Sequence, residues 1–144
     1  MNADPIEFGK QKFIELGIDV DMSVMRLQDL ANIESNSVDV AYTSAVLQHI
    51  PPEYISDILA NMIRISRTYV VLWELHGFSP ADAYVHKFTI DASTDLDGRW
   101  LHDYWNILER LGVERELITA QQLDPKICLG KVSDANCIFS FPVP

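Results

Sequence analysis

The chain has 144 residues, of which 48% are hydrophobic and 22% are charged, a composition typical of one folded domain and not of a disordered segment. Its 21 acidic residues against 11 Lys and Arg give a formal net charge of -10, which disfavours binding to nucleic acid or to an anionic membrane surface. The two cysteines form no Cys-x-x-Cys pair, and no secretory leader or membrane-length apolar run is present, so we expect a soluble cytoplasmic protein with reduced thiols.

The N-terminal segment carries the signals of a helix. Asp4 is a candidate N-cap, Pro5 suits the first helical position, and Glu7 stands where a capping box places its acid. Apolar residues follow at spacings of three and four until Gly17, which is a typical residue just beyond a helix end. Beyond it, apolar residues at alternate positions predict a strand over Ile18–Leu27.

The middle of the chain predicts a strand, a helix and a second strand. Residues Ser37–Thr43 alternate Val and Tyr with smaller or polar side chains, as strands do. Pro51 and Pro52 then open a helix with one apolar stripe. The next segment, Thr68–Glu74, is apolar on both faces, which is typical of the buried centre of a parallel sheet covered by helices.

The C-terminal part predicts one more helix and two more strands. The long irregular stretch Leu75–Gly98 indicates a functional loop or locally helical segment. Apolar residues from Leu101 onward share one helix face up to Gly112, and Val113–Ala120 and Asn136–Val143 then predict an antiparallel strand pair. We therefore expect an α/β fold with a mostly parallel sheet, an antiparallel C-terminal strand pair and helices on both faces.

Four segments carry a family resemblance. Leu27–Leu30, Ser35–Pro51, Asn61–Ser66 and Thr68–Glu74 together resemble the class I S-adenosylmethionine-dependent methyltransferases, in which an acid closes the third strand, an "SxDV" phrase opens the fourth and "VLxHIP" follows it. The closing strand pair resembles the sixth and seventh strands of that family. The resemblance implies an incomplete Rossmann-like methyltransferase sheet and S-adenosylmethionine as the cofactor.

The glycine-rich cofactor loop of that family is absent from the sequence. None of the six glycines lie two residues apart, whereas a ligand that approaches the backbone closely needs glycine there. The resemblance therefore implies that residues 1–144 form a single methyltransferase-like domain without the first two strands and first helix of the family. In the family's sheet order, 3-2-1-4-5-7-6, that loss leaves strand four with a bare edge. This edge can pair either with the preceding strand or with a second subunit. We expect self-association into a homo-oligomer.

Cofactor-binding candidates follow from the resemblance. Asp29 would accept a hydrogen bond from the adenine amino group, with Leu30 beside it; the alternative is a loop acid that caps a turn. Thr43, Ser44 and Ala45 follow a strand at the carboxyl edge of the sheet, where open α/β sheets bind ligands.

Catalytic and substrate candidates lie downstream of these. His49 is a candidate base or substrate-orienting group, or else it holds its turn by local hydrogen bonds. Glu74 ends a buried strand, where an acid needs a partner, so it is either a catalytic candidate or an ion-pair partner of Arg64 or Arg67. The region that recognises the methyl acceptor in this family contains the substrate candidates His76, His102 and Tyr104. Their spacing matches no metal-ligand motif, and we expect no metal.

Two functions of different classes remain open from the sequence. The first is an S-adenosylmethionine-dependent methyltransferase acting on a small molecule, in which orientation of donor and acceptor supplies most of the catalysis. The second is a non-catalytic Rossmann-like remnant that works as a self-associating or partner-binding module. The intact segments around strands four and five favour the first, and the missing glycine-rich loop favours the second.

Overall fold

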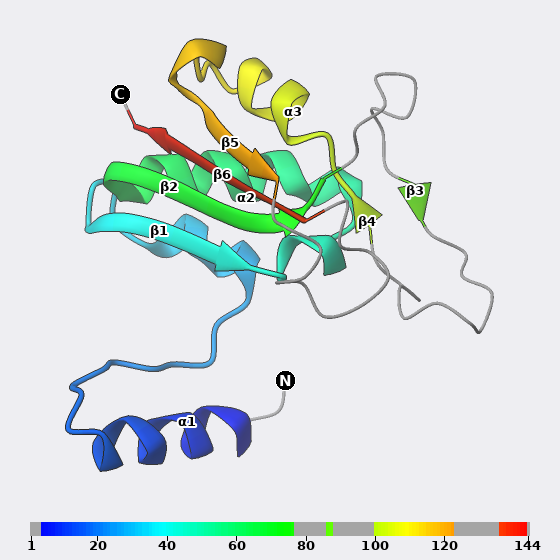
Figure 1. Ribbon diagram of the computed structural model, residues 1–144. Coiled ribbons are helices and arrows are strands. Elements are labelled where there is room, and N and C mark those ends of the chain that lie inside the picture. Colours follow the sequence, from blue (N-terminus) through cyan, green and yellow to red (C-terminus); the bar gives the residue numbers. More distant parts are fainter. Residues whose placement is uncertain (1–3, 77–85, 88–99, 123–135, 144) are drawn as a thin grey trace.

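A computed structural model describes residues 4–76, 86–87, 100–122 and 136–143 (Figure 1). In chain order its elements are α1 (Asp4–Glu15), the 3-10 helix η1 (Leu27–Asn32), β1 (Val38–Ser44), the 3-10 helix η2 (Leu47–His49), α2 (Pro52–Ile65), β2 (Ser66–Leu75), β3 (His86–Lys87), β4 (Trp100–Leu101), α3 (Tyr104–Arg110), the 3-10 helix η4 (Arg115–Leu117), β5 (Thr119–Gln122) and β6 (Asn136–Pro142).

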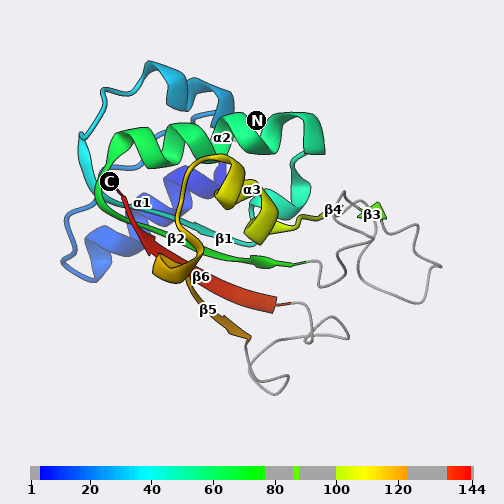
Figure 2. The same cartoon turned by 90° about the horizontal axis from the view of Figure 1, so that it is seen from above.

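Four strands form the main sheet, in the order β1-β2-β6-β5. The strands β1 and β2 are parallel and are joined by α2, whereas β6 runs antiparallel to both β2 and β5. The short strands β3 and β4 pair separately as an antiparallel ribbon. The expected α/β architecture is confirmed, with its parallel crossover and its antiparallel C-terminal pair. Two expected details differ among the described residues: only one of the three pairings in the main sheet is parallel, and α2 and α3 both lie on one face instead of on both faces (Figure 2).

The core lies between the sheet and the helices α2 and α3, which cover one face of it in Figure 2. The predicted apolar stripe of α2 is buried there, and it consists of Ile55, Ile58, Leu59, Met62 and Ile65. Val70 and Leu72 of β2 and Phe139 and Phe141 of β6 pack from the sheet side. Burial of these side chains supplies the main free energy that holds the sheet and helices together.

The other face of the sheet exposes large apolar side chains. Val40 and Tyr42 of β1 and Tyr69 and Trp73 of β2 are all exposed, and the strand register places them on the same side. The helix α1 does not cover them, because it lies beyond the β1 edge, at the end of an extended segment (Figure 1). Among the described residues, no helix is both long and apolar enough to span a membrane.

One predicted strand and two predicted boundaries need correction. The strand predicted over Ile18–Leu27 is wrong: the chain is irregular up to Arg26, and Leu27 begins η1. Alternating side chains suit a strand, but a strand also needs a neighbour for its backbone groups. The strand predicted over Val113–Ala120 begins only at Thr119, because η4 precedes it. The helix predicted from Leu101 begins at Tyr104, where Asp103 accepts a hydrogen bond from the backbone N–H of Asn106 (3.1 Å).

Candidate active site

The loop that follows β1 lies at the carboxyl edge of the parallel pair β1–β2. Its first residue, Ala45, has φ +54°, in the left-handed region that favours glycine. The backbone N–H of Ala45 donates to the carbonyl of Trp73 (2.9 Å), and its own carbonyl accepts from the side-chain amide of Gln48 (3.0 Å). The chain therefore turns sharply at the point where an open α/β sheet binds its ligands.

Glu74 holds this loop in place from the end of β2. Its carboxylate accepts hydrogen bonds from the backbone N–H groups of Val46 (3.0 Å), Leu47 (3.1 Å) and Gln48 (3.4 Å), and the residue is only 1% exposed. These three donors satisfy the carboxylate in the way that Arg64 or Arg67 was expected to. Those two arginines bond elsewhere, to backbone carbonyls near η1 and to Asp39.

Burial raises the pKa of the Glu74 carboxyl above its ordinary value, because the charged form loses its hydration. The N–H groups of Val46 and Leu47 oppose this effect by stabilising the carboxylate. The nearby Thr43 hydroxyl also favours the charged form, although it makes no hydrogen bond of regular geometry. Glu74 is thus a buried acid whose charged form is stabilised by the backbone N–H groups of the loop that it holds.

Two histidines lie beside this loop. The ring of His102 is wholly buried, and its Nε2 lies 3.0 Å from the carbonyl oxygen of Leu47. A carbonyl oxygen only accepts, so Nε2 carries the proton. Nδ1 has no hydrogen-bond partner among the described residues and is left as an acceptor. By the same reasoning Nδ1 of His76 donates to the carbonyl oxygen of His102 (3.1 Å). The two histidines therefore link β2, the loop and the segment before α3.

The phenol of Tyr104 completes a buried polar cluster. Its ring centroid lies 5.8 Å from that of His102, 6.2 Å from that of His76 and 5.5 Å from that of Phe139. The hydroxyl is buried, and no described residue hydrogen-bonds to it. Burial, with a smaller contribution from the nearby Glu74 charge, raises the pKa of Tyr104 well above its ordinary value, so the phenol stays protonated.

The expected site residues fall into two groups. One group meets at the loop after β1 and beneath it: Thr43, Ser44, Ala45, Glu74, His76, His102 and Tyr104. His49 belongs to the same loop, where its exposed ring lies 3.3 Å from the amide nitrogen of Gln48. The second group, Asp29 and Leu30, lies on η1. Asp29 accepts a hydrogen bond there from the backbone N–H of Arg26 (3.1 Å), so its turn-capping role is present.

Arg64 of α2 fixes η1 and escaped the sequence reasoning as a functional residue. Its guanidinium donates to the carbonyls of Leu30 (2.9 Å) and Ile33 (2.8 Å), to the Ser35 hydroxyl (3.0 Å) and to the Asn61 side chain (3.1 Å). An arginine in the last turn of a helix carries little signal in a sequence, because three of its four partners lie about thirty residues away.

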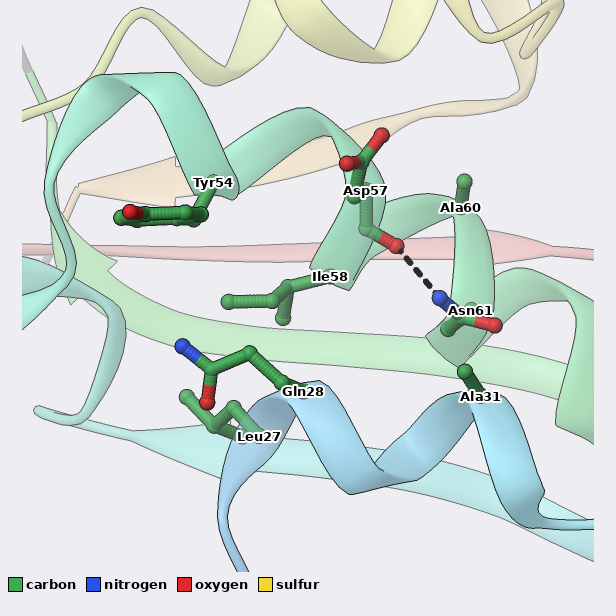
Figure 3. A pocket seen from close by; sticks show the side chains of 8 residues that line it. All are labelled: Leu27, Gln28, Ala31, Tyr54, Asp57, Ile58, Ala60 and Asn61. Carbon is green, nitrogen blue, oxygen red and sulfur yellow. Dashed lines mark hydrogen bonds between the residues drawn. The ribbon is translucent and has the colours of Figure 1, made fainter.

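A surface pocket of about 270 Å³ lies between η1 and α2 (Figure 3). Apolar side chains of Leu27, Ala31 and Ile58 line it together with the polar ends of Gln28, Tyr54 and Asn61. None of the expected site residues line it. The pocket thus shows how η1 and α2 face one another and adds no group to the site above.

Replacing Ala45 by glycine should stabilise the fold, because the left-handed conformation costs a non-glycine residue about 1–2 kcal/mol, which exceeds the entropy cost of glycine. We expect a gain of about 0.5 kcal/mol in the free energy of unfolding, measured by urea denaturation. Asn36, at φ +55°, is the matched control, since asparagine tolerates this region and Asn36→Gly should change less. Equal gains at both positions would refute strain at Ala45.

The two buried histidines should make stability fall in acid. Burial lowers the pKa of both below the ordinary 6.5, so below pH 6.5 the unfolded chain binds protons that the native chain does not. The free energy of unfolding then falls with pH, by at most about 1.4 kcal/mol per pH unit for each histidine. Glu74 acts with the opposite sign, because its raised pKa keeps a proton on the native chain above 4.5.

Comparing the wild type with His102→Gln isolates the contribution of one histidine to this pH dependence. A glutamine amide keeps a donor for the Leu47 carbonyl but does not titrate. Urea denaturation between pH 5 and pH 8 should give a shallower acid slope for the variant. Identical slopes would show that His102 does not resist protonation in the native chain.

Solved structures share this fold. The chain matches no protein-family model and no curated protein. An S-adenosylmethionine-dependent methyltransferase from Methanosarcina mazei matches with a TM-score of 0.64 and 16% identity, over 98% of this chain and 78% of that one. Another from Archaeoglobus fulgidus matches with a TM-score of 0.56 and 15% identity, over 95% and 73%. The fold is that of the class I methyltransferases.

A protein from Pyrococcus horikoshii OT3 has the same fold, with a TM-score of 0.60 and 10% identity over 99% of this chain and 68% of its own. The chain therefore spans about two thirds to four fifths of each of these methyltransferase-fold structures. Within the described residues no three His, Cys, Asp or Glu side chains gather in a metal-binding arrangement.

Proposed function

We propose that this chain contributes to an S-adenosylmethionine-dependent methyltransferase that acts on a small molecule. One observation carries the proposal: the loop after β1, with its left-handed Ala45, is fixed by Glu74 at the carboxyl edge of a methyltransferase-type sheet. That edge is where open α/β sheets bind their ligands. The two named methyltransferases among the structural neighbours support the choice of cofactor.

The described residues fit part of such a cofactor. Asp29, partly buried on η1, supplies a carboxylate, and Leu30 supplies an apolar contact for an adenine ring. Ser44 and Ala45 supply hydroxyl and backbone groups at the sheet edge, and Thr43 lies buried directly before them. The described glycines at positions 9, 17 and 112 do not follow a strand of the sheet, so the close backbone approach of a glycine-rich turn is not among these groups. The cofactor, when bound, supplies the methyl group.

The remaining residues orient the acceptor and exclude water. His49 is exposed on the loop, so it is the group we propose as base or orienting residue. Glu74, His102 and Tyr104 lie beneath it, fully buried, and His76 is nearly so. We therefore assign Glu74 to hold the loop in its working shape, and the other three to form the floor of the acceptor site. Such preorganisation is the main contribution that a methyltransferase site makes to its rate.

Calorimetric titration with S-adenosylmethionine and with S-adenosylhomocysteine tests the proposal. We expect both to bind, and Asp29→Ala to weaken them about tenfold, which corresponds to about 1.4 kcal/mol. Asp57→Ala is the matched control, because Asp57 is an acid on α2 in the pocket that contains no expected site residue. An absence of heat and of a thermal shift at millimolar cofactor would refute binding by this chain.

A second function, a non-catalytic module that associates with itself, is favoured by a different observation. The strand β1 lies at the end of the sheet order, and its side chains Val40 and Tyr42 are exposed. Exposed apolar edge strands tend to find a partner strand. Failure of the cofactor titration together with a mass larger than one chain would favour this function over the first.

A further inference from the structure

The outer edge of β1 carries backbone groups without a partner strand among the described residues. The N–H groups of Ser37 and Ala45 donate toward the β2 side, to the carbonyls of Ile65 and Trp73, and the Asp39 carbonyl accepts from the Thr68 hydroxyl on that side. Backbone groups alternate in direction along a strand. The N–H and C=O groups that point outward are therefore those of the even-numbered residues Val38, Val40, Tyr42 and Ser44.

We propose that β1 pairs antiparallel with β1 of a second copy of this chain, about a twofold axis at Ala41. This inference deepens the proposed association by naming the partner and the register. With Ala41 opposite its copy, all seven residues of β1 are used. The outward-pointing residues then meet one another, Val40 opposite Tyr42 and Val38 opposite Ser44, and each pair exchanges both backbone hydrogen bonds.

The side chains suit this register. On the exposed face each Val40 meets a Tyr42, an aromatic and β-branched pair that stabilises neighbouring strands. On the helix-covered face Asp39 meets Thr43, so no two like charges oppose one another. Registers centred on Val40 or Tyr42 shorten the overlap to residues 38–42 or 40–44, and both lose the Val40–Tyr42 and Asp39–Thr43 pairings. Strand β1 is thus close to self-complementary about its central alanine, which argues for a second copy and against an unrelated strand.

The net charge of -10 does not prevent this pairing. Asp39, the single charged residue of β1, already pairs with Arg67 of β2 (3.2 Å). Repulsion between more distant charges is screened within about 8 Å at physiological ionic strength. The helices of both copies would cover the same face of the continuous sheet, and α1, which lies beyond the β1 edge (Figure 1), would have to move aside. A strand pair of this length is a small interface, so we expect a weak dimer.

Sedimentation equilibrium and a cysteine cross-link test the proposal. The wild type should show a mass that rises toward two chains with concentration. In a Cys128→Ser background, Ala41→Cys should form a disulfide-linked dimer under mild oxidation, because opposed residues of this kind have Cα atoms about 4.5 Å apart, within disulfide range. Asp39→Cys is the control, since in this register it lies roughly 13 Å from its copy.

Three outcomes would overturn the pairing. They are a mass of one chain at every concentration, cross-linking of Asp39→Cys as fast as that of Ala41→Cys, and a dimer mass without cross-linking of Ala41→Cys. The mass of the wild type is informative even if a cysteine variant fails to fold. Neither measurement involves the cofactor, so a failure here leaves the titration with S-adenosylmethionine to decide the methyltransferase proposal separately.

Discussion

Glu74→Ala should lower the free energy of unfolding by about 3 kcal/mol, as measured by urea denaturation at pH 7. The truncation removes the acceptor for three backbone N–H groups, those of Val46, Leu47 and Gln48. Two of these bonds are to buried groups, and each buried donor left without a partner costs about 1–3 kcal/mol. The expected loss of stability exceeds that of most single substitutions, because this one side chain accepts the hydrogen bonds of three successive backbone N–H groups.

Two comparisons make this result specific. Glu109→Ala removes an acid whose ion pair with Arg115 (2.7 Å) is exposed, so it should change stability by less than about 1 kcal/mol. Glu74→Gln keeps the size of the side chain and one acceptor oxygen, but its NH₂ group would face a backbone N–H of the loop, and two donors cannot bond. We therefore expect an intermediate loss of stability. If Glu74→Ala cost no more than Glu109→Ala, Glu74 would not be the residue that fixes the loop.

Segments whose local pattern and tertiary partners agree were predictable from the sequence. The helix α2 begins at Pro52, close to its predicted start, because proline suits a first turn and the apolar stripe faces the sheet. Gly17 and Gly112 end helices with φ of +67° and +85°. The irregular structure of segment 18–26 was not predictable. Its alternating pattern is typical of a strand, but a sequence pattern does not show whether a neighbouring strand is present to pair with it.

Chain order predicts in part which candidate residues lie near one another, but it does not predict their contacts. Chain order places Thr43 and Glu74 at the carboxyl ends of two strands, and the parallel pairing of β1 with β2 brings those ends together. The contact of His102 with the Leu47 carbonyl joins residues 55 positions apart, and no spacing in the sequence encodes it. The partner of Glu74 was missed for a similar reason: a buried acid predicts that donors are near, but backbone N–H groups satisfy it as well as arginines do.

The other large effect should come from Arg64→Ala. Its guanidinium donates to two carbonyls and a hydroxyl around η1, at Leu30, Ile33 and Ser35. Hydrogen bonds to a charged donor contribute about 1.5–3 kcal/mol each when well buried. Since these are only partly buried, we expect a total loss of about 2 kcal/mol in the free energy of unfolding. If η1 presents Asp29 to the cofactor, S-adenosylmethionine should also bind about tenfold more weakly.

Two further variants separate these effects. Lysine keeps the charge but lacks the planar fork that reaches several acceptors at once, so Arg64→Lys should recover less than half of the lost stability. Arg67→Ala is the matched control, because Arg67 makes an exposed ion pair with Asp39 of the neighbouring strand, and it should lose less than about 1 kcal/mol. Full recovery by lysine would show that α2 holds η1 by charge alone. A stability loss without any change in cofactor affinity would instead remove η1, and Asp29 with it, from the binding site.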